Sequence, residues 1–219
     1  MTASHIDLTT ALNACRTGDI WIFRGRSAAD RAIQTLTNSP VNHVGMAVVL
    51  DDLPPLMWHA ELGKTLQDMW SGKFQRGVQL HDMRAAVLQW SGKYEQRSWL
   101  RQLHTPVTRE QEDALLRTIA RMDGTAFPTT AKLAGRWFEG RIPGTRGRGK
   151  SSAALETAYC AEVVAMTYDA MGLLVGNKKA NWFDPGKFWS GDRLPLAPGV
   201  TLGAEIAVDV PVHHAAVTR

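Results

Sequence analysis

Two side chains in this sequence could carry out nucleophilic catalysis together. Cys160 stands near the start of a predicted helix, 158–171, and a helix N-terminus favours the thiolate form and offers free N–H groups to an oxyanion. His43 directly precedes the apolar run Val44–Leu50, which predicts a buried strand. A rigid strand would hold the imidazole in place as a general base for the thiol.

A third polar group follows on the next predicted strand, 56–62. His59 and Glu61 are two residues apart, so their side chains share one strand face. If the two strands form a hairpin, either group could orient the His43 ring; His59 is our first choice and Glu61 our second. Each residue also has a structural interpretation: Cys160 as a core residue, His43 as a bonded strand end, His59 and Glu61 as a solvent-facing pair. The other histidines are predicted to be surface residues: His5, His81, His104, His213 and His214.

The elements around these residues predict an α+β fold. Strands are expected at 18–25, 44–50, 56–62, 78–82, 98–103 and 204–210, and helices at 27–36, 108–122 and 158–171. The helix 108–122 begins with a capping-box pattern, Thr108 with Gln111. The spacing of the strands predicts a small antiparallel sheet or barrel packed against helices.

Composition limits the remaining possibilities. The chain has 219 residues, 44% hydrophobic and 21% charged, which predicts one globular domain over 1–219. It has no apolar run of membrane-spanning length and no recognisable signal peptide, so a cytoplasmic location with two free thiols is expected. No CxxC, HxxxH or HExxH spacing occurs, and no metal or other cofactor is expected.

The positive charge is concentrated in one segment. The net charge is +4, while residues 132–150 hold six basic residues and one acid, a local +5. This Gly- and Arg-rich stretch is predicted to be a loop, so nucleic acid is not the expected partner of the whole protein. Arg141, Arg146 and Arg148 are instead candidate substrate-binding residues of a lid that attracts an anionic substrate.

Four strings in this order carry a family resemblance: TGDIWIF, TNSPVNHVGMAVVL, LMWHAEL and YCAEVV. They resemble the circularly permuted papain-like branch of the NlpC/P60 superfamily, which includes YiiX/YaeF-type bacterial amidases and the lecithin–retinol acyltransferase group. The resemblance implies a permuted papain-like fold with His43 as the base and Cys160 as the nucleophile. It places His59, or else Glu61, in the strand of the third member. Asn42 stands where Ser is common, Ala161 replaces the usual Ser after the cysteine, and residues 78–158 match no part of the family pattern.

The function implied is that of a cysteine-dependent hydrolase or acyltransferase. It would act on an amide, ester or thioester through a thioacyl-enzyme, with Tyr159 beside the nucleophile as a pocket residue. The substrate would be a small molecule, a peptide or a lipid-like acyl compound, and the oligomeric state stays open. The alternatives are a non-catalytic binding module on the same fold, and a binder of anionic head groups or nucleic acid that uses the loop 132–150.

Overall fold

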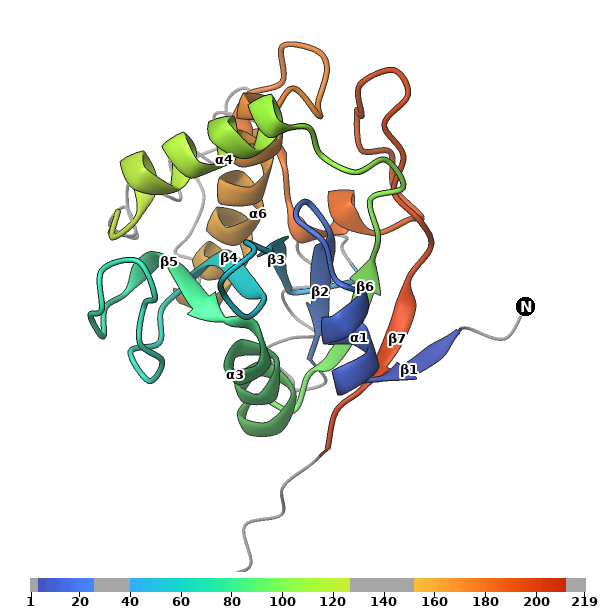
Figure 1. Cartoon of the computed structure of the whole chain (residues 1–219). Coiled ribbons are helices and arrows are strands. Elements are labelled where there is room, and N and C mark those ends of the chain that lie inside the picture. Colours follow the sequence, from blue (N-terminus) through green and yellow to red (C-terminus); the bar gives the residue numbers. More distant parts are fainter. Residues whose placement is uncertain (1–3, 26–39, 127–151, 212–219) are drawn as a thin grey trace, which may run out of the picture.

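The protein forms a seven-stranded sheet with helices on both faces (Figure 1). The computed structural model describes residues 4–25, 40–126 and 152–211. The strands are β1 (His5–Asp7), β2 (Ile20–Arg24), β3 (His43–Val48), β4 (Leu56–Glu61), β5 (Gly77–Asp82), β6 (Arg97–Arg101) and β7 (Ile206–Asp209). Their order in the sheet is β1-β7-β6-β2-β3-β4-β5, and every pair is antiparallel except β1 with β7.

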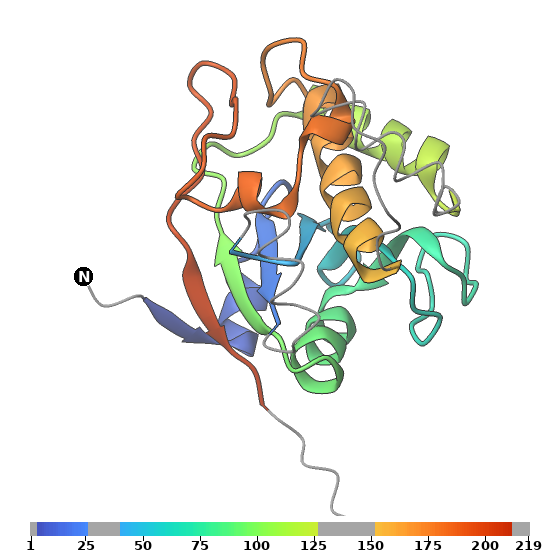
Figure 2. The same ribbon diagram turned by 180° about the vertical axis from the view of Figure 1, so that it is seen from behind.

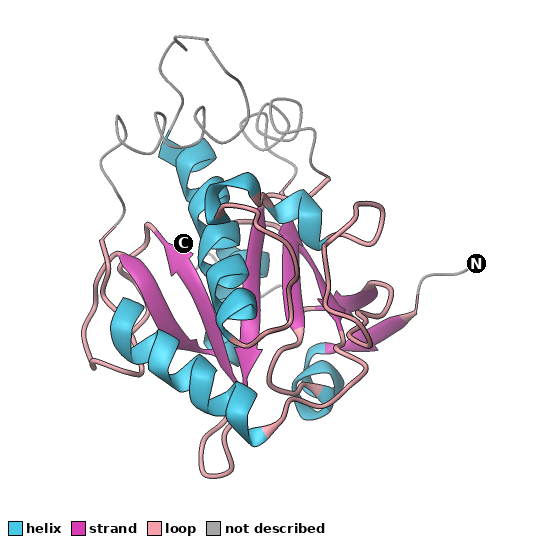
Figure 3. Cartoon of the chain, turned by 90° about the horizontal axis from the view of Figure 1, so that it is seen from above, coloured by secondary structure: helices cyan, strands magenta, loops and turns pink. Residues whose placement is uncertain are grey.

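Different helices cover the two faces of the sheet. The α-helices are α1 (Leu8–Ala14), α3 (Met83–Leu88), α4 (Arg109–Met122) and α6 (Ser152–Ala170). A π-helical turn, η1 (Gln89–Lys93), follows α3, and two 3₁₀ turns, η2 (Ala180–Trp182) and η3 (Pro185–Phe188), follow α6. The elements α1 and α3 stand in front of the sheet in Figure 1, whereas α6 lies in front in the view from behind (Figure 2) and runs along the strands in the view from above (Figure 3).

Alternation along the strands divides the core in two. Val44, Met46 and Trp58 pack with α6 in one cluster, which we call the α6 core. Ala47 and Met57 point the other way and pack with α1, α3 and Trp90 in a second cluster, which we call the α3 core. All six residues of β3 and of β4 are buried, as expected for strands covered on both faces.

The mixed α+β class and the β3–β4 hairpin predicted from the sequence are confirmed. The barrel alternative is wrong, because the edge strands β1 and β5 do not pair with each other and the sheet is open. The capping box at Thr108 is present: its side chain accepts from the backbone of Gln111, whose side chain accepts from the backbone of Thr108.

The start of the cysteine helix differs from the prediction. Helix α6 begins at Ser152, so Cys160 is its ninth residue, whereas the predicted helix 158–171 made it the third. Only the first four N–H groups of a helix lack an intrahelical partner. The expectation that Cys160 sits at a helix N-terminus with free N–H groups is therefore wrong. The predicted helix 27–36 and the whole basic loop 132–150 lie outside the described residues.

Candidate functional site

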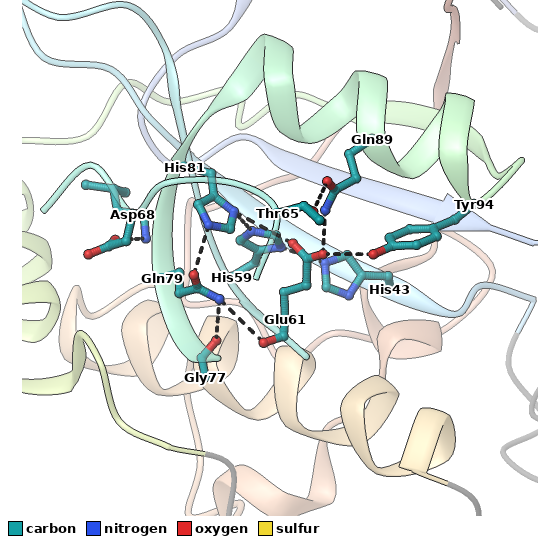
Figure 4. Close-up of polar contacts among 11 residues, drawn as sticks. His43, His59, Glu61, Thr65, Asp68, Gly77, Gln79, His81, Gln89 and Tyr94 are labelled. Carbon is teal, nitrogen blue, oxygen red and sulfur yellow. Dashed lines mark hydrogen bonds and ion pairs between the residues drawn. The ribbon is translucent and has the colours of Figure 1, made fainter. Parts of the chain in front are cut away.

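A row of three buried histidines crosses strands β3, β4 and β5 (Figure 4). His43 Nε2 lies 2.9 Å from His59 Nδ1, and His59 Nε2 lies 2.9 Å from His81 Nδ1. His81 Nε2 is in turn 3.0 Å from Gln79 Oε1. The three rings are at most 1% exposed, so these contacts form a continuous hydrogen-bonded row away from solvent.

The strand register explains why these side chains meet. His59 is paired with Gln79 and Met57 with His81, so His59 and His81 lie diagonally on one face of the β4–β5 ladder. The position of His43 beside His59 follows from the β3–β4 register, in which Met46 is paired with Trp58. Strand geometry thus places all the members of the row on the side of the α3 core.

Glu61 lies beside His81, at the end of the row that we call the inner end; His43 forms the outer end. Its Oε1 accepts hydrogen bonds from Gln89 Nε2 at 2.6 Å and from the Tyr94 hydroxyl at 3.2 Å. Its Oε2 is buried, has no hydrogen-bond partner within residues 4–25, 40–126 and 152–211, and lies 3.8 Å from His81 Nδ1. Figure 4 shows the carboxylate pointing toward the rings.

Burial keeps the rings neutral near pH 7. Desolvation lowers the pKa of His43 to about 3 and that of His81 to about 4, and it lowers the pKa of His59 well below its usual range. Desolvation also raises the pKa of Glu61, against the hydrogen bonds from Tyr94 and Gln89 and the attraction of Lys93.

The outer end of the row is packed by aromatic rings. The indole of Trp90 stacks on the His43 imidazole with centroids 3.8 Å apart and planes 11° apart, and Phe23 lies on another side at 5.8 Å. His43 Nδ1 is buried, and none of the described residues makes a hydrogen bond to it. Trp90 belongs to η1, which the sequence analysis did not identify.

The structure brings together three of the predicted site residues, His43, His59 and Glu61. Cys160 is fully buried in the α6 core, and it makes no hydrogen bond to either ring nitrogen of His43 in the described part of the chain. Tyr159 is buried beside it in α6. Arg141, Arg146 and Arg148 lie outside the described residues.

Two further members of the site were missed or misplaced by sequence reasoning. His81 was expected on the surface, but it is 1% exposed, and this expectation is wrong. Gln79 ends the row through its side-chain oxygen, while its Nε2 is 3.4 Å and 3.5 Å from the carbonyl oxygens of Glu61 and Gly77. The sequence signal for these two residues is their alternation with Val78 and Leu80, which places Gln79 and His81 together on one face of the strand.

Fold and site together define an open, largely antiparallel α+β protein with a buried histidine row on one sheet face. No protein-family model and no curated protein matches the chain. Among solved structures it is similar to the metalloprotein YiiX from Escherichia coli O157:H7, at 23% identity and a TM-score of 0.50, over 90% of this chain and 99% of that one. The chain therefore has a YiiX-like fold. In the described residues, no helix is both long and apolar enough to cross a membrane.

Proposed function

We propose that this protein is a cysteine-dependent hydrolase or acyltransferase with Cys160 as nucleophile, His43 as general base and His59 as the group that orients the base. The observation that carries the proposal is the donor-to-acceptor direction of the hydrogen bonds along the histidine row, which we call its polarity. A general base must present a bare nitrogen lone pair to the proton that it takes.

The polarity follows from Gln79. The amide nitrogen of Gln79 faces two backbone carbonyls, so its oxygen faces His81 and must accept a hydrogen from His81 Nε2. Neutral His81 then has a bare Nδ1, which accepts from His59 Nε2. His59 Nδ1 is bare in turn and accepts from His43 Nε2.

The last atom of the row is therefore an unprotonated His43 Nδ1, which is buried and has no hydrogen-bond partner in the described part of the chain. When it takes the thiol proton, His43 becomes an imidazolium that donates from Nε2 to His59. The bond to His59 both fixes the ring orientation and stabilises the charged form. The thiolate then attacks the acyl carbonyl, and His43 returns the proton to the leaving group as the thioacyl-enzyme forms.

The position of α6 along β3 supports the pairing with Cys160. The Tyr168 hydroxyl donates to the Gly18 carbonyl, and the Gly18 N–H donates to the Ala47 carbonyl. Cys160 precedes Tyr168 by eight residues, about 12 Å of helix, and His43 precedes Ala47 by four residues, about 13 Å of strand. The thiol lies on the α6 side and the ring on the α3 side, so the two would meet around the end of β3, where His43 is the first residue.

Thiol alkylation tests the proposal, because Cys15 is a matched control within the chain. Cys15 is also a buried free thiol, and desolvation raises its pKa to about 12. We expect iodoacetamide to modify Cys160 about tenfold or more faster than Cys15 at pH 7, as measured by peptide mass spectrometry. His43→Ala should remove that difference, while His104→Ala, an exposed histidine bonded to Thr201, should not.

The same assay separates the two candidates for the third member. His59→Ala removes the acceptor of the His43 Nε2 hydrogen and should slow Cys160 alkylation, whereas Glu61→Gln leaves that bond intact. Circular dichroism would verify that each variant is folded. A rate for Cys160 no faster than for Cys15, or an unchanged rate in His43→Ala, would overturn the proposed function.

A further inference from the structure

Three ligand-type atoms converge at the inner end of the histidine row. One nitrogen each of His59 and His81 and one oxygen of Glu61 lie within 4.8 Å of one another, and all three residues are buried. They come from the neighbouring strands β4 and β5 and project from one face of the sheet (Figure 4). Their positions are fixed by the ladder rather than by a mobile loop.

A second observation also points to a missing ligand. Glu61 is 1% exposed, yet its Oε2 has no hydrogen-bond partner among the residues that the structure describes, and it lies 3.8 Å from His81 Nδ1. A buried carboxylate oxygen without a partner is costly, and such groups are normally paired or bound to a metal. The other oxygen of Glu61 is already held by Gln89 and Tyr94.

The outer atoms of the cluster are arranged as metal ligands require. A metal-bound histidine usually donates its second ring N–H to an oxygen or nitrogen acceptor. His81 Nε2 faces the Gln79 side-chain oxygen at 3.0 Å, and His59 Nδ1 faces His43 Nε2 at 2.9 Å. His59 Nε2 and His81 Nδ1 are thereby left to face the cluster.

The spacing fits a tetrahedral ion with small adjustments. Two ligands at about 2.0–2.1 Å from Zn²⁺ in tetrahedral geometry are about 3.3 Å apart. The two nitrogens are 2.9 Å apart, the His81 Nδ1–Glu61 Oε2 distance is 3.8 Å, and all three ligand atoms lie within 4.8 Å of one another. The nitrogens must therefore separate by about half an ångström, and the Glu61 carboxylate must turn toward both rings. Two imidazoles and one carboxylate favour Zn²⁺ and similar transition metals over Ca²⁺ or Mg²⁺.

We propose that His59, His81 and Glu61 form a binding site for a divalent transition-metal ion of the Zn²⁺ class, and that the bound ion switches off His43 as a base. The second part rests on the proposed function. An ion on His59 Nε2 moves the hydrogen of His59 to Nδ1, which then donates to His43 Nε2. The hydrogen of His43 moves to Nδ1, so three rings keep three hydrogens and the bare lone pair is lost.

Metal titration tests the site directly. The full chain, with His213 and His214 changed to Asn and treated with a chelator, would be titrated with Co²⁺ and Zn²⁺ by visible absorption and calorimetry. We expect one ion per chain and no thiolate-to-Co²⁺ charge-transfer band. Glu61→Gln and His81→Gln should each weaken binding by more than the roughly 10–100-fold that loss of an outer partner costs, while His104→Gln should match the parent.

Each result decides one part of the inference. Equal binding in His81→Gln and the parent, or a thiolate band, would overturn the site. If the ion binds but Cys160 alkylation is equally fast with and without it, the switch is overturned and the site stands. If Cys160 is no more reactive than Cys15 in the metal-free protein, the proposed function fails, and the titration still decides the metal site.

Discussion

Replacing Glu61 by Gln should stabilise the metal-free protein. Glu61 is 1% exposed, and one of its carboxylate oxygens finds no hydrogen-bond partner in the part of the chain that the structure describes. The effective cost of burying a charge is several kcal/mol, taken here as about 4 kcal/mol. Gln removes that charge, but the hydrogen bonds from Gln89 and Tyr94 then reach a neutral oxygen and each loses about 1 kcal/mol. The buried amide N–H groups that replace Oε2 add a desolvation cost of about 1 kcal/mol. The net gain is about 1 kcal/mol, or about 2–4 °C in Tm for a chain of this length.

Thermal unfolding in the presence of a chelator measures this gain. Glu205 provides the matched control: it lies 3.6 Å from Arg101 and accepts from Ser190, so Glu205→Gln should lower Tm. A Tm for Glu61→Gln below that of the parent would refute the reasoning, because it would mean that the carboxylate is paired in the folded protein. With saturating Zn²⁺ the order should reverse, since the parent binds the ion more tightly.

Three other substitutions test the framework around the site. Gly45→Ala would place a methyl group 2.8 Å from Met57 Cγ, and should cost about 1–3 kcal/mol in urea unfolding. Burial and Asp68 raise the pKa of Asp123 from 3.8 to about 7, so its contribution to folding is complete below about pH 4 and is lost as pH rises to about 7. Asp123→Asn should therefore flatten the fall in Tm between about pH 4 and pH 7. Arg101→Met removes a guanidinium that donates to the carbonyls of Phe188 and Gly203 and lies beside Glu205, and should lower the free energy of unfolding by about 3 kcal/mol.

The central strands could be predicted because they are buried on both faces. The apolar run after His43 and the turn-rich stretch before Leu56 were enough to indicate the β3–β4 hairpin. The two-residue spacing of His59 and Glu61 then placed both side chains on one face, as the structure has them. Capping chemistry likewise identified the start of α4 at Thr108.

The cover over the histidine row could not be predicted in the same way. It is built by α3, of six residues, and by a π-helical turn, and neither is long enough to show a hydrophobic period. When α3 and η1 are not predicted, the alternating positions of Gln79 and His81 indicate a strand face exposed to solvent. The early start of α6 has a different reason: residues 151–157 lie between the predicted loop 132–150 and the predicted helix 158–171 and show no capping pattern. The helix propensity of Ala153, Ala154 and Leu155 is the only sequence signal for that start.

Two buried polar atoms of this site lack a hydrogen-bond partner in the described part of the chain, and they explain why the row carries both proposals. They are His43 Nδ1 at one end and Glu61 Oε2 beside the other. Between them every ring nitrogen of His59 and His81 has a partner, and the direction of each hydrogen bond fixes the next. Thiol chemistry needs His43 Nδ1 as a proton acceptor. Glu61 Oε2 lacks a cation to pair with. Because one row of hydrogen bonds has one direction at a time, filling the cation site turns His43 Nδ1 from an acceptor into a donor. The two ends are therefore opposed, and metal binding and thiol activation should exclude each other in the same molecule.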